Sequence, residues 1–153
     1  MWFFEEEKIK MAQTRYARED ACGQQFTALE PSDIVYMKLK GKVTLDECRQ
    51  INRAQLSYAQ DVSNFIYFID LTELEDLPPE VRKEASGTVK LLPVRGTVIF
   101  NAPLRAKVLA RLLLTASNLF RRGPEVNPLV FVDSEQEGRN WIEKRRRELA
   151  TAA

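Results

Sequence analysis

The sequence predicts one α/β domain with a mixed, mostly parallel β-sheet, an N-terminal β-hairpin and about four helices. The chain has 153 residues, which is the usual size of a single domain. Its composition, 44% hydrophobic and 29% charged, is ordinary for a globular protein. Short apolar segments alternate with amphipathic ones, as in sheets whose parallel strands are joined by helices.

The N-terminal stretch, residues 1–20, has no clear secondary-structure signal, and we treat it as an extension of a domain that covers residues 21–150. It opens with Met-Trp-Phe-Phe before three glutamates. So short an apolar run fits neither a signal peptide nor a membrane span, and we expect a soluble, cytoplasmic protein. Exposed aromatic residues would form a sticky surface, so we expect this triplet to pack on the domain or on a partner.

The domain is expected to begin with a β-hairpin. Phe26 and Leu29 precede the turn-forming residues 30–33. Residues 34–39 then alternate between two faces, of which one is more fully apolar and should point at the core. Gly41 ends this second strand.

A helix, a central strand and a second helix follow. Thr44 and Glu47 have the spacing of a capping box, which predicts a helix over residues 45–59. Residues 64–70 are apolar on both alternating faces, as expected of a strand in the middle of a sheet with helices on either side. Residues 76–80 contain two prolines and predict the start of the next helix.

The strongest amphipathic helix is predicted over residues 104–122, after a short buried strand at residues 96–100. We expect its wide apolar face to pack on the sheet. The residues of that face are Leu104, Val108, Leu109, Leu112, Leu113, Ala116, Leu119 and Phe120.

The last predicted strand covers residues 129–132. Asp133 or Ser134 then caps a closing helix that buries Trp141 and Ile142. The order of elements is therefore hairpin, helix, strand, helix, strand, helix, strand, helix.

Three segments carry a recognisable fold-level pattern: Gly-Lys-Val-Thr at residues 41–44, Phe-Ile-Asp-Leu-Thr at 68–72, and Val-Phe-Val-Asp-Ser-Glu-Gln-Glu at 130–137 ahead of Trp141. Through them, residues 24–148 resemble STAS-like domains, the SpoIIAA-like group typified by anti-sigma-factor antagonists. The architecture is also similar to that of the lipid-binding CRAL-TRIO domains. The resemblance implies a module that binds partners or small ligands.

Phosphorylation-switched members of this group carry an Asp-Ser-Ser-Gly-like segment at the start of the helix after the central strand. Residues 76–80 are Asp-Leu-Pro-Pro-Glu instead, with no hydroxyl group to accept phosphate. The resemblance therefore implies a regulatory module without the usual phosphorylation switch.

The composition excludes several kinds of chemistry. Histidine is absent, which removes Ser-His-Asp and Cys-His catalysis and any metal site that needs imidazole. Cys22 and Cys48 are far apart in sequence and are read as reduced thiols, too few for a four-thiolate zinc site. We expect no cofactor and no metal. A formal net charge of +1 gives no global attraction to nucleic acid.

Two candidate sites surround the helix at residues 103–121. Asn101, Arg105 and Lys107 lie at its start, where free N–H groups and basic side chains can hold an anion; the alternative is that Asn101 caps the helix and the basic side chains are solvated. The cationic helix as a whole could contact lipid or a small ligand, and the alternative is that its apolar face belongs to the core.

A third candidate site follows the central strand, near the carboxyl edge of the sheet where α/β proteins place ligands. Asp70, Thr72 and Asp76 are its residues, with Glu73 and Glu75 beside them. Such acids can act as acid and base or hold magnesium, whereas acids in a polar loop are usually just solvated.

The basic run at residues 144–147 is read as complementing the carbonyl end of the closing helix, so no nucleic-acid partner is expected. The sequence favours a non-enzymatic regulatory or protein-interaction module whose partner is another protein or a second copy of the chain. A small-ligand or lipid-binding protein is the alternative, and an enzyme using the acids is third.

Overall fold

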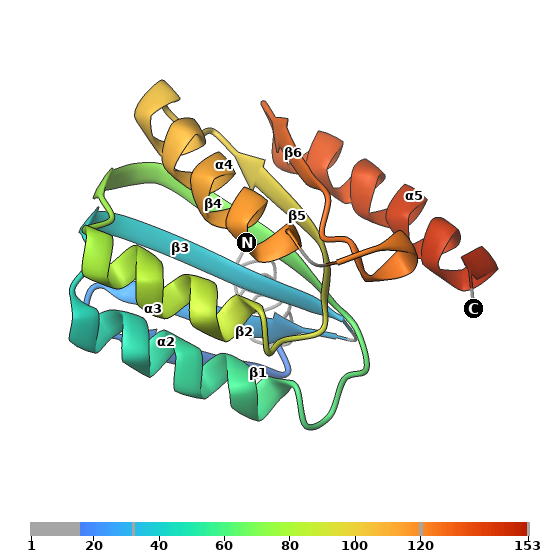
Figure 1. The fold of residues 1–153 in the computed structure, drawn as a ribbon, viewed down its shortest axis with the longest axis horizontal. Helices are drawn as coiled ribbons and strands as arrows, with labels where there is room; N and C mark the ends of the chain where they lie inside the picture. The colour runs from blue at the N-terminus through green and yellow to red at the C-terminus, as the bar shows by residue number, and fades with distance from the viewer. Residues whose placement is uncertain (1–15, 32, 120, 153) are drawn as a thin grey trace, which may run out of the picture.

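The computed structural model describes residues 16–31, 33–119 and 121–152, and within these ranges six strands form a single sheet with four α-helices around it (Figure 1). The strands are β1 (Arg18–Cys22), β2 (Gln25–Glu30), β3 (Ile34–Lys42), β4 (Phe65–Asp76), β5 (Val94–Phe100) and β6 (Leu129–Val132). The helices are α2 (Leu45–Tyr58), α3 (Pro79–Val89), α4 (Leu104–Asn118) and α5 (Glu135–Ala152), with a 3₁₀ turn, η1 (Gly123–Glu125).

The strands lie in the sheet in the order of the sequence, from β1 to β6. β1, β2 and β3 pair antiparallel, while β3 to β6 pair parallel. The three parallel pairs are connected by α2, α3 and α4 in turn. The predicted single α/β domain with a mixed sheet is confirmed, and the N-terminal hairpin is the β2–β3 part of a three-stranded antiparallel segment.

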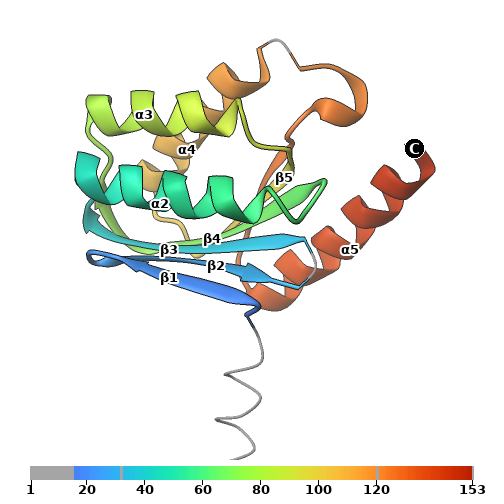
Figure 2. The same cartoon turned by 90° about the horizontal axis from the view of Figure 1, so that it is seen from below.

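The helices form two layers on either side of the sheet. α2, α3 and α4 cover one face, and α5 runs across the other face near β5 and β6 (Figures 1 and 2). β4 contributes to both cores, because Tyr67 and Ile69 pack under α2, α3 and α4 whereas Ile66 and Phe68 pack with Ile142 of α5. The prediction of a central strand that is apolar on both faces is therefore confirmed.

Glu47 attaches α2 to the β1–β2 turn as well as capping the helix. Its carboxylate accepts hydrogen bonds from the N–H of Thr44 at 3.0 Å and from the N–H of Gln24 at 2.8 Å. The Thr44 hydroxyl accepts in return from the N–H of Glu47 at 3.1 Å. The predicted capping box is thus confirmed, and the same carboxylate satisfies a donor of the neighbouring turn, which local pattern could not show.

α5 lies close to the sheet because Gly138 faces β4 and β5. A Cβ atom at this position would lie 2.5 Å from the Phe68 ring and 3.0 Å from Val98 Cγ1. Next to it, Arg139 makes paired hydrogen bonds to Glu30 at 3.1 and 3.3 Å, and its guanidinium lies 5.4 Å from the centre of the Phe68 ring. These contacts join the closing helix to β2, β4 and β5.

Several predicted boundaries need correction. β1 begins at Arg18, inside the stretch that the sequence left without assigned structure, whereas Trp2, Phe3 and Phe4 lie outside the described residues. β4 extends to Asp76, because it continues to pair with β3 beyond residue 70 through two irregularities in register. α4 ends at Asn118 and not at residue 122.

Candidate functional site

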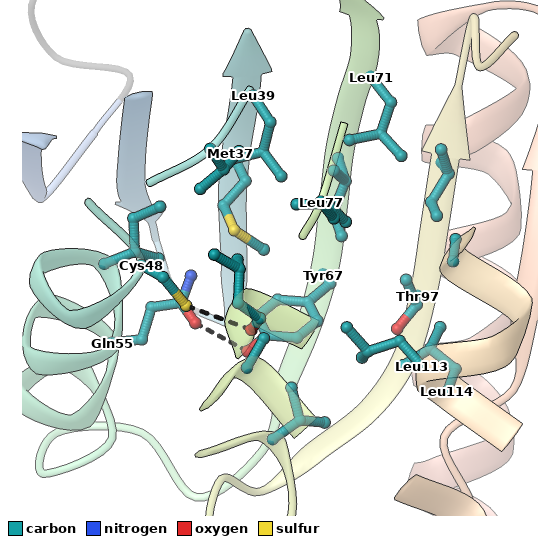
Figure 3. Close-up of a pocket in the computed structure, with 18 of the residues that line it drawn as sticks. Met37, Leu39, Cys48, Gln55, Tyr67, Leu71, Leu77, Thr97, Leu113 and Leu114 are labelled. Atoms are coloured by element: carbon teal, nitrogen blue, oxygen red, sulfur yellow. Dashed lines mark hydrogen bonds between the residues drawn. The ribbon is translucent and has the colours of Figure 1, made fainter. Parts of the chain in front are cut away.

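An apolar cavity of about 110 Å³ lies between the sheet and the three helices that cover it (Figure 3). Its floor is formed by alternate side chains of β3, β4 and β5, and its roof by the inner faces of α2, α3 and α4. The floor residues are Met37, Leu39, Tyr67, Ile69, Leu71, Thr97 and Ile99, and the roof residues include Cys48, Ile51, Gln55, Val81, Ala85, Val89, Ala110, Leu113 and Leu114.

The cavity exists where two facing helices carry small side chains. Ala85 of α3 and Ala110 of α4 both line it, in positions where a larger aliphatic residue would extend into the space. Protein interiors are normally packed without voids larger than a water molecule. Ala85 and Ala110 are therefore two positions at which a larger side chain would reduce the volume.

Three polar side chains in the wall, those of Tyr67, Gln55 and Thr97, are hydrogen-bonded within the protein. The Tyr67 hydroxyl donates to Gln55 Oε1 at 2.7 Å (Figure 3). Gln55 Nε2 donates in turn to the Thr27 hydroxyl at 3.2 Å. On the opposite side, the Thr97 hydroxyl donates to Asn127 Oδ1 at 2.8 Å. Because these groups are engaged with one another, the space itself presents an apolar surface.

Burial keeps the two titratable wall groups neutral. It raises the pKa of the Cys48 thiol to about 11, with Glu84 adding to the shift. Burial also raises the pKa of the Tyr67 phenol well above its ordinary value. A thiol that stays protonated at neutral pH is a poor nucleophile, so Cys48 acts in the wall as a small apolar group. Cys22 and Cys48 are both free, as the sequence predicts.

α4 is apolar on two opposite sides, which corrects the expectation that its apolar face packs on the sheet. Only Ala106, Leu114 and Ser117 are buried in this helix. Four aliphatic side chains point away from the core, with exposed fractions of 78% for Leu104, 52% for Val108, 61% for Leu112 and 71% for Leu119. We call these four residues the outer stripe. Phe120 lies outside the described residues.

The predicted anion site at the start of α4 has a different geometry from that expected. Asn101 has a left-handed backbone, with φ of +56°, and the residue that caps the helix is Pro103, which has no side-chain donor or acceptor. Arg105 pairs with Asp76 at 3.6 Å, and Lys107 lies over the Phe131 ring at 5.6 Å. Arg105 and Lys107 are therefore engaged with different parts of the protein.

The residues of the third candidate site are on β4, so the expectation that they occupy a loop is wrong. Asp70 Oδ1 accepts from the Thr72 hydroxyl at 2.6 Å, and Asp76 pairs with Lys42 of β3 in the ladder. Glu73 forms ion pairs with Lys38 at 3.4 Å and with Lys40. The continued pairing of β3 with β4 spreads these acids along the strand.

The basic run in α5 also has a role other than the predicted one. α5 continues to Ala152, so these residues are not at its carbonyl end. Arg145 donates to the backbone oxygen atoms of Arg95 and Val126, and Arg146 is paired with Asp33 and Glu143. Arg145 and Arg146 hold the helix against β5, the β2–β3 turn and the loop before β6.

The cavity was missed by the sequence interpretation, although each of its walls was predicted. Its local signals are Ala85 and Ala110, which are indistinguishable in sequence from other alanines in helices. No helix within the described ranges combines the length and apolar character needed to cross a membrane.

No protein-family model matches the chain, and no curated protein matches it. Among solved structures, the fold is similar to that of an uncharacterised protein of the DUF3478 family from Shewanella loihica PV-4, which has a SpoIIAA-like fold. The TM-score is 0.52 at 16% sequence identity, over 81% of this chain and 89% of the other. The predicted SpoIIAA-like fold is therefore confirmed.

Proposed function

We propose that this protein is a non-enzymatic binding module of the SpoIIAA-like fold that holds a small apolar molecule in the cavity beneath α3 and α4. The observation that carries the proposal is the cavity of about 110 Å³ with apolar walls. An apolar cavity of roughly 150 Å³ stays dry and takes up benzene or xenon in a well-studied engineered protein. A cavity with such walls favours hydrocarbon groups over polar ones.

The cost of the open volume supports a role in binding. At roughly 24 cal/mol per Å³, a cavity of this size lowers stability by about 2–3 kcal/mol relative to a filled core. A single larger residue at Ala85 or Ala110 would recover part of that energy. A bound apolar molecule offsets the same cost.

α4 offers the route of entry. It has three buried residues, and its cap, Pro103, makes no side-chain hydrogen bond to the first turn. Ala110, Leu113 and Leu114 are its contributions to the cavity wall. A movement of α4 away from the sheet would open the cavity to a ligand larger than the resting space.

A non-enzymatic role agrees with the chemistry of the wall. The described wall residues offer no activated nucleophile or base, because burial raises the pKa of Cys48 and that of Tyr67. Gln55 and Thr97 are held in hydrogen bonds within the protein. The cavity suits retention of a ligand better than its conversion.

A regulatory role through protein contact is the second candidate, and the outer stripe of α4 favours it. Regulation and ligand binding are compatible, because α4 forms one wall of the cavity and also carries the stripe. A ligand that displaces α4 would change the surface offered to a partner.

Xenon binding tests the proposal. We expect xenon NMR of the full chain to show saturable binding, and Ala110→Leu to abolish it by filling the cavity. Ala116→Leu is the matched control, since it makes the same change on an exposed position of the same helix and should bind as wild type does. Native mass spectrometry of freshly purified protein should also show a retained apolar ligand in wild type and in Ala116→Leu. Equal xenon binding by Ala110→Leu and wild type, or none by wild type, would overturn the proposal.

A further inference from the structure

The four residues of the outer stripe lie along one side of α4, with the exposed Thr115 in the gap between Leu112 and Leu119. The stripe residues are spaced by four, four and seven positions, so they fall on the same side of the helix. The line extends for about 22 Å at 1.5 Å per residue. Leu91, 75% exposed, lies in the loop between α3 and β5, where Arg121 donates to the carbonyl groups of Val89 and Leu92. Isolated exposed aliphatic residues are ordinary, but an ordered line of this length marks an interaction site.

Basic side chains flank the stripe on both sides. In a helix of 3.6 residues per turn, Arg105 falls on one flank, and Lys107 and Arg111 fall on the other. Residues 101–124 contain no aspartate or glutamate. Lys107 and Arg111 lie over the Phe131 ring, a contact that leaves their positive charge in place.

The charge and shape of this surface identify its partner. A second copy docked through the same stripe would bring two basic flanks together without an acidic residue of α4 to pair with them. The outer stripe is also a convex line of aliphatic side chains without an aromatic anchor, whereas protein contacts gain most of their energy from aromatic or arginine side chains seated in pockets. An apolar line with cationic flanks is complementary to an anionic bilayer surface.

We propose that α4 lies on an anionic membrane surface, with Leu104, Val108, Leu112 and Leu119 in the acyl boundary and the flanking basic residues at the head groups. This inference rests on the proposed function, because it names the membrane as the source of the apolar ligand that the cavity would hold. The opposite side of the helix forms the cavity wall through Ala110, Leu113 and Leu114. Docking α4 on the bilayer therefore places the cavity wall next to a supply of apolar molecules.

Vesicle co-sedimentation of the full chain tests this inference. We expect wild type to sediment with vesicles of phosphatidylserine and phosphatidylcholine in equal amounts, and to stay in the supernatant with phosphatidylcholine alone. Val108→Glu combined with Leu112→Glu should abolish sedimentation. Lys107→Gln combined with Arg111→Gln should lower the partition coefficient by about 25-fold, since each basic residue near an anionic surface contributes about fivefold, whereas Arg105 is already paired with Asp76.

Leu56→Glu is the matched control, because Leu56 is 41% exposed on α2, outside the stripe, and should sediment as wild type does. The inference is overturned if wild type stays in the supernatant with anionic vesicles, or if it binds neutral vesicles equally well. It is also overturned if Leu56→Glu loses as much sedimentation as the stripe variant does. A stable homodimer, measured by analytical ultracentrifugation, that Val108→Glu with Leu112→Glu dissociates overturns it as well. Xenon binding by the same variants separates the two proposals: intact xenon binding without sedimentation rejects membrane docking alone, and sedimentation without xenon binding rejects the cavity ligand alone.

Discussion

The hydroxyl of Tyr67 donates a 2.7 Å hydrogen bond to Gln55 Oε1 and so connects the floor of the cavity to its roof. Each residue is 2% exposed. Gln55 also donates to Thr27 of β2, so a single amide links α2 to two strands. Because both side chains are buried, each of these groups depends on its partner for satisfaction.

The Tyr67–Gln55 bond should show strong energetic coupling. Tyr67→Phe should lower the free energy of unfolding by about 1–3 kcal/mol, because it leaves Gln55 Oε1 buried without this donor. Gln55→Leu should cost a similar amount by leaving the Tyr67 hydroxyl unsatisfied. The double variant, measured by urea denaturation, should lose less than the sum of the two; additive losses would argue against coupling.

Two helical glycines should respond in opposite directions to alanine. Gly138→Ala should destabilise by about 1–3 kcal/mol, because the new Cβ meets Phe68 and Val98. Gly87→Ala should stabilise by roughly 0.5–1 kcal/mol, since nothing lies within 4 Å of its Cβ position and alanine is the better helix former. Thermal unfolding of both variants measures the effect, and a stabilised Gly138→Ala would contradict the close approach of α5 to the sheet.

Cys48 should make the protein less stable at alkaline pH. Burial raises the pKa of its thiol from 9.0 to about 11, so the folded state holds this proton more tightly than the unfolded state does. The resulting stability is fully present below pH 9.0 and is lost as the pH rises toward 11, at up to about 1.4 kcal/mol per pH unit. Cys48→Ala should flatten the slope of unfolding free energy against pH in this range. Parallel slopes for the two proteins would show that the thiol does not contribute.

Glu47 should contribute stability that depends on its negative charge. Burial opposes ionisation, but the hydrogen bonds from Thr44, Gln24 and Gln25 outweigh it and hold the pKa of Glu47 below 4.5. Its contribution is therefore present above pH 4.5 and is lost as the pH falls through the lower folded value. Glu47→Gln should cost about 1–3 kcal/mol at neutral pH, and less in acid.

The exposed Glu80, in the first turn of α3, provides the control for this measurement. Urea denaturation of Glu80→Gln should differ little from wild type at either pH. A Glu47→Gln difference that is independent of pH would mean that the carboxylate acts by shape and not by charge.

Local signals predicted the elements well. The capping box at Thr44 and Glu47 satisfies the first N–H groups of a helix within a few residues, so its pattern is visible in sequence. The apolar run from Phe65 to Ile69 can be covered on both faces only in the middle of a sheet, which is where β4 lies. The end of this strand was predicted too early, because Glu73, Leu74 and Asp76 pair with β3, a contact between distant parts of the chain.

The sequence by itself determined the order and type of the helices and strands from β2 to α5, because capping, alternation and turn chemistry act between neighbouring residues; β1 was not predicted. Only the tertiary structure decided that Ala85 and Ala110 face a common space, that Asp76 meets Arg105, and that α4 turns four aliphatic side chains outward. Periodicity shows that a helix has an apolar face but not which side the sheet will cover. That choice follows from how three helices share one face of the sheet, and it depends on contacts between residues far apart in the chain.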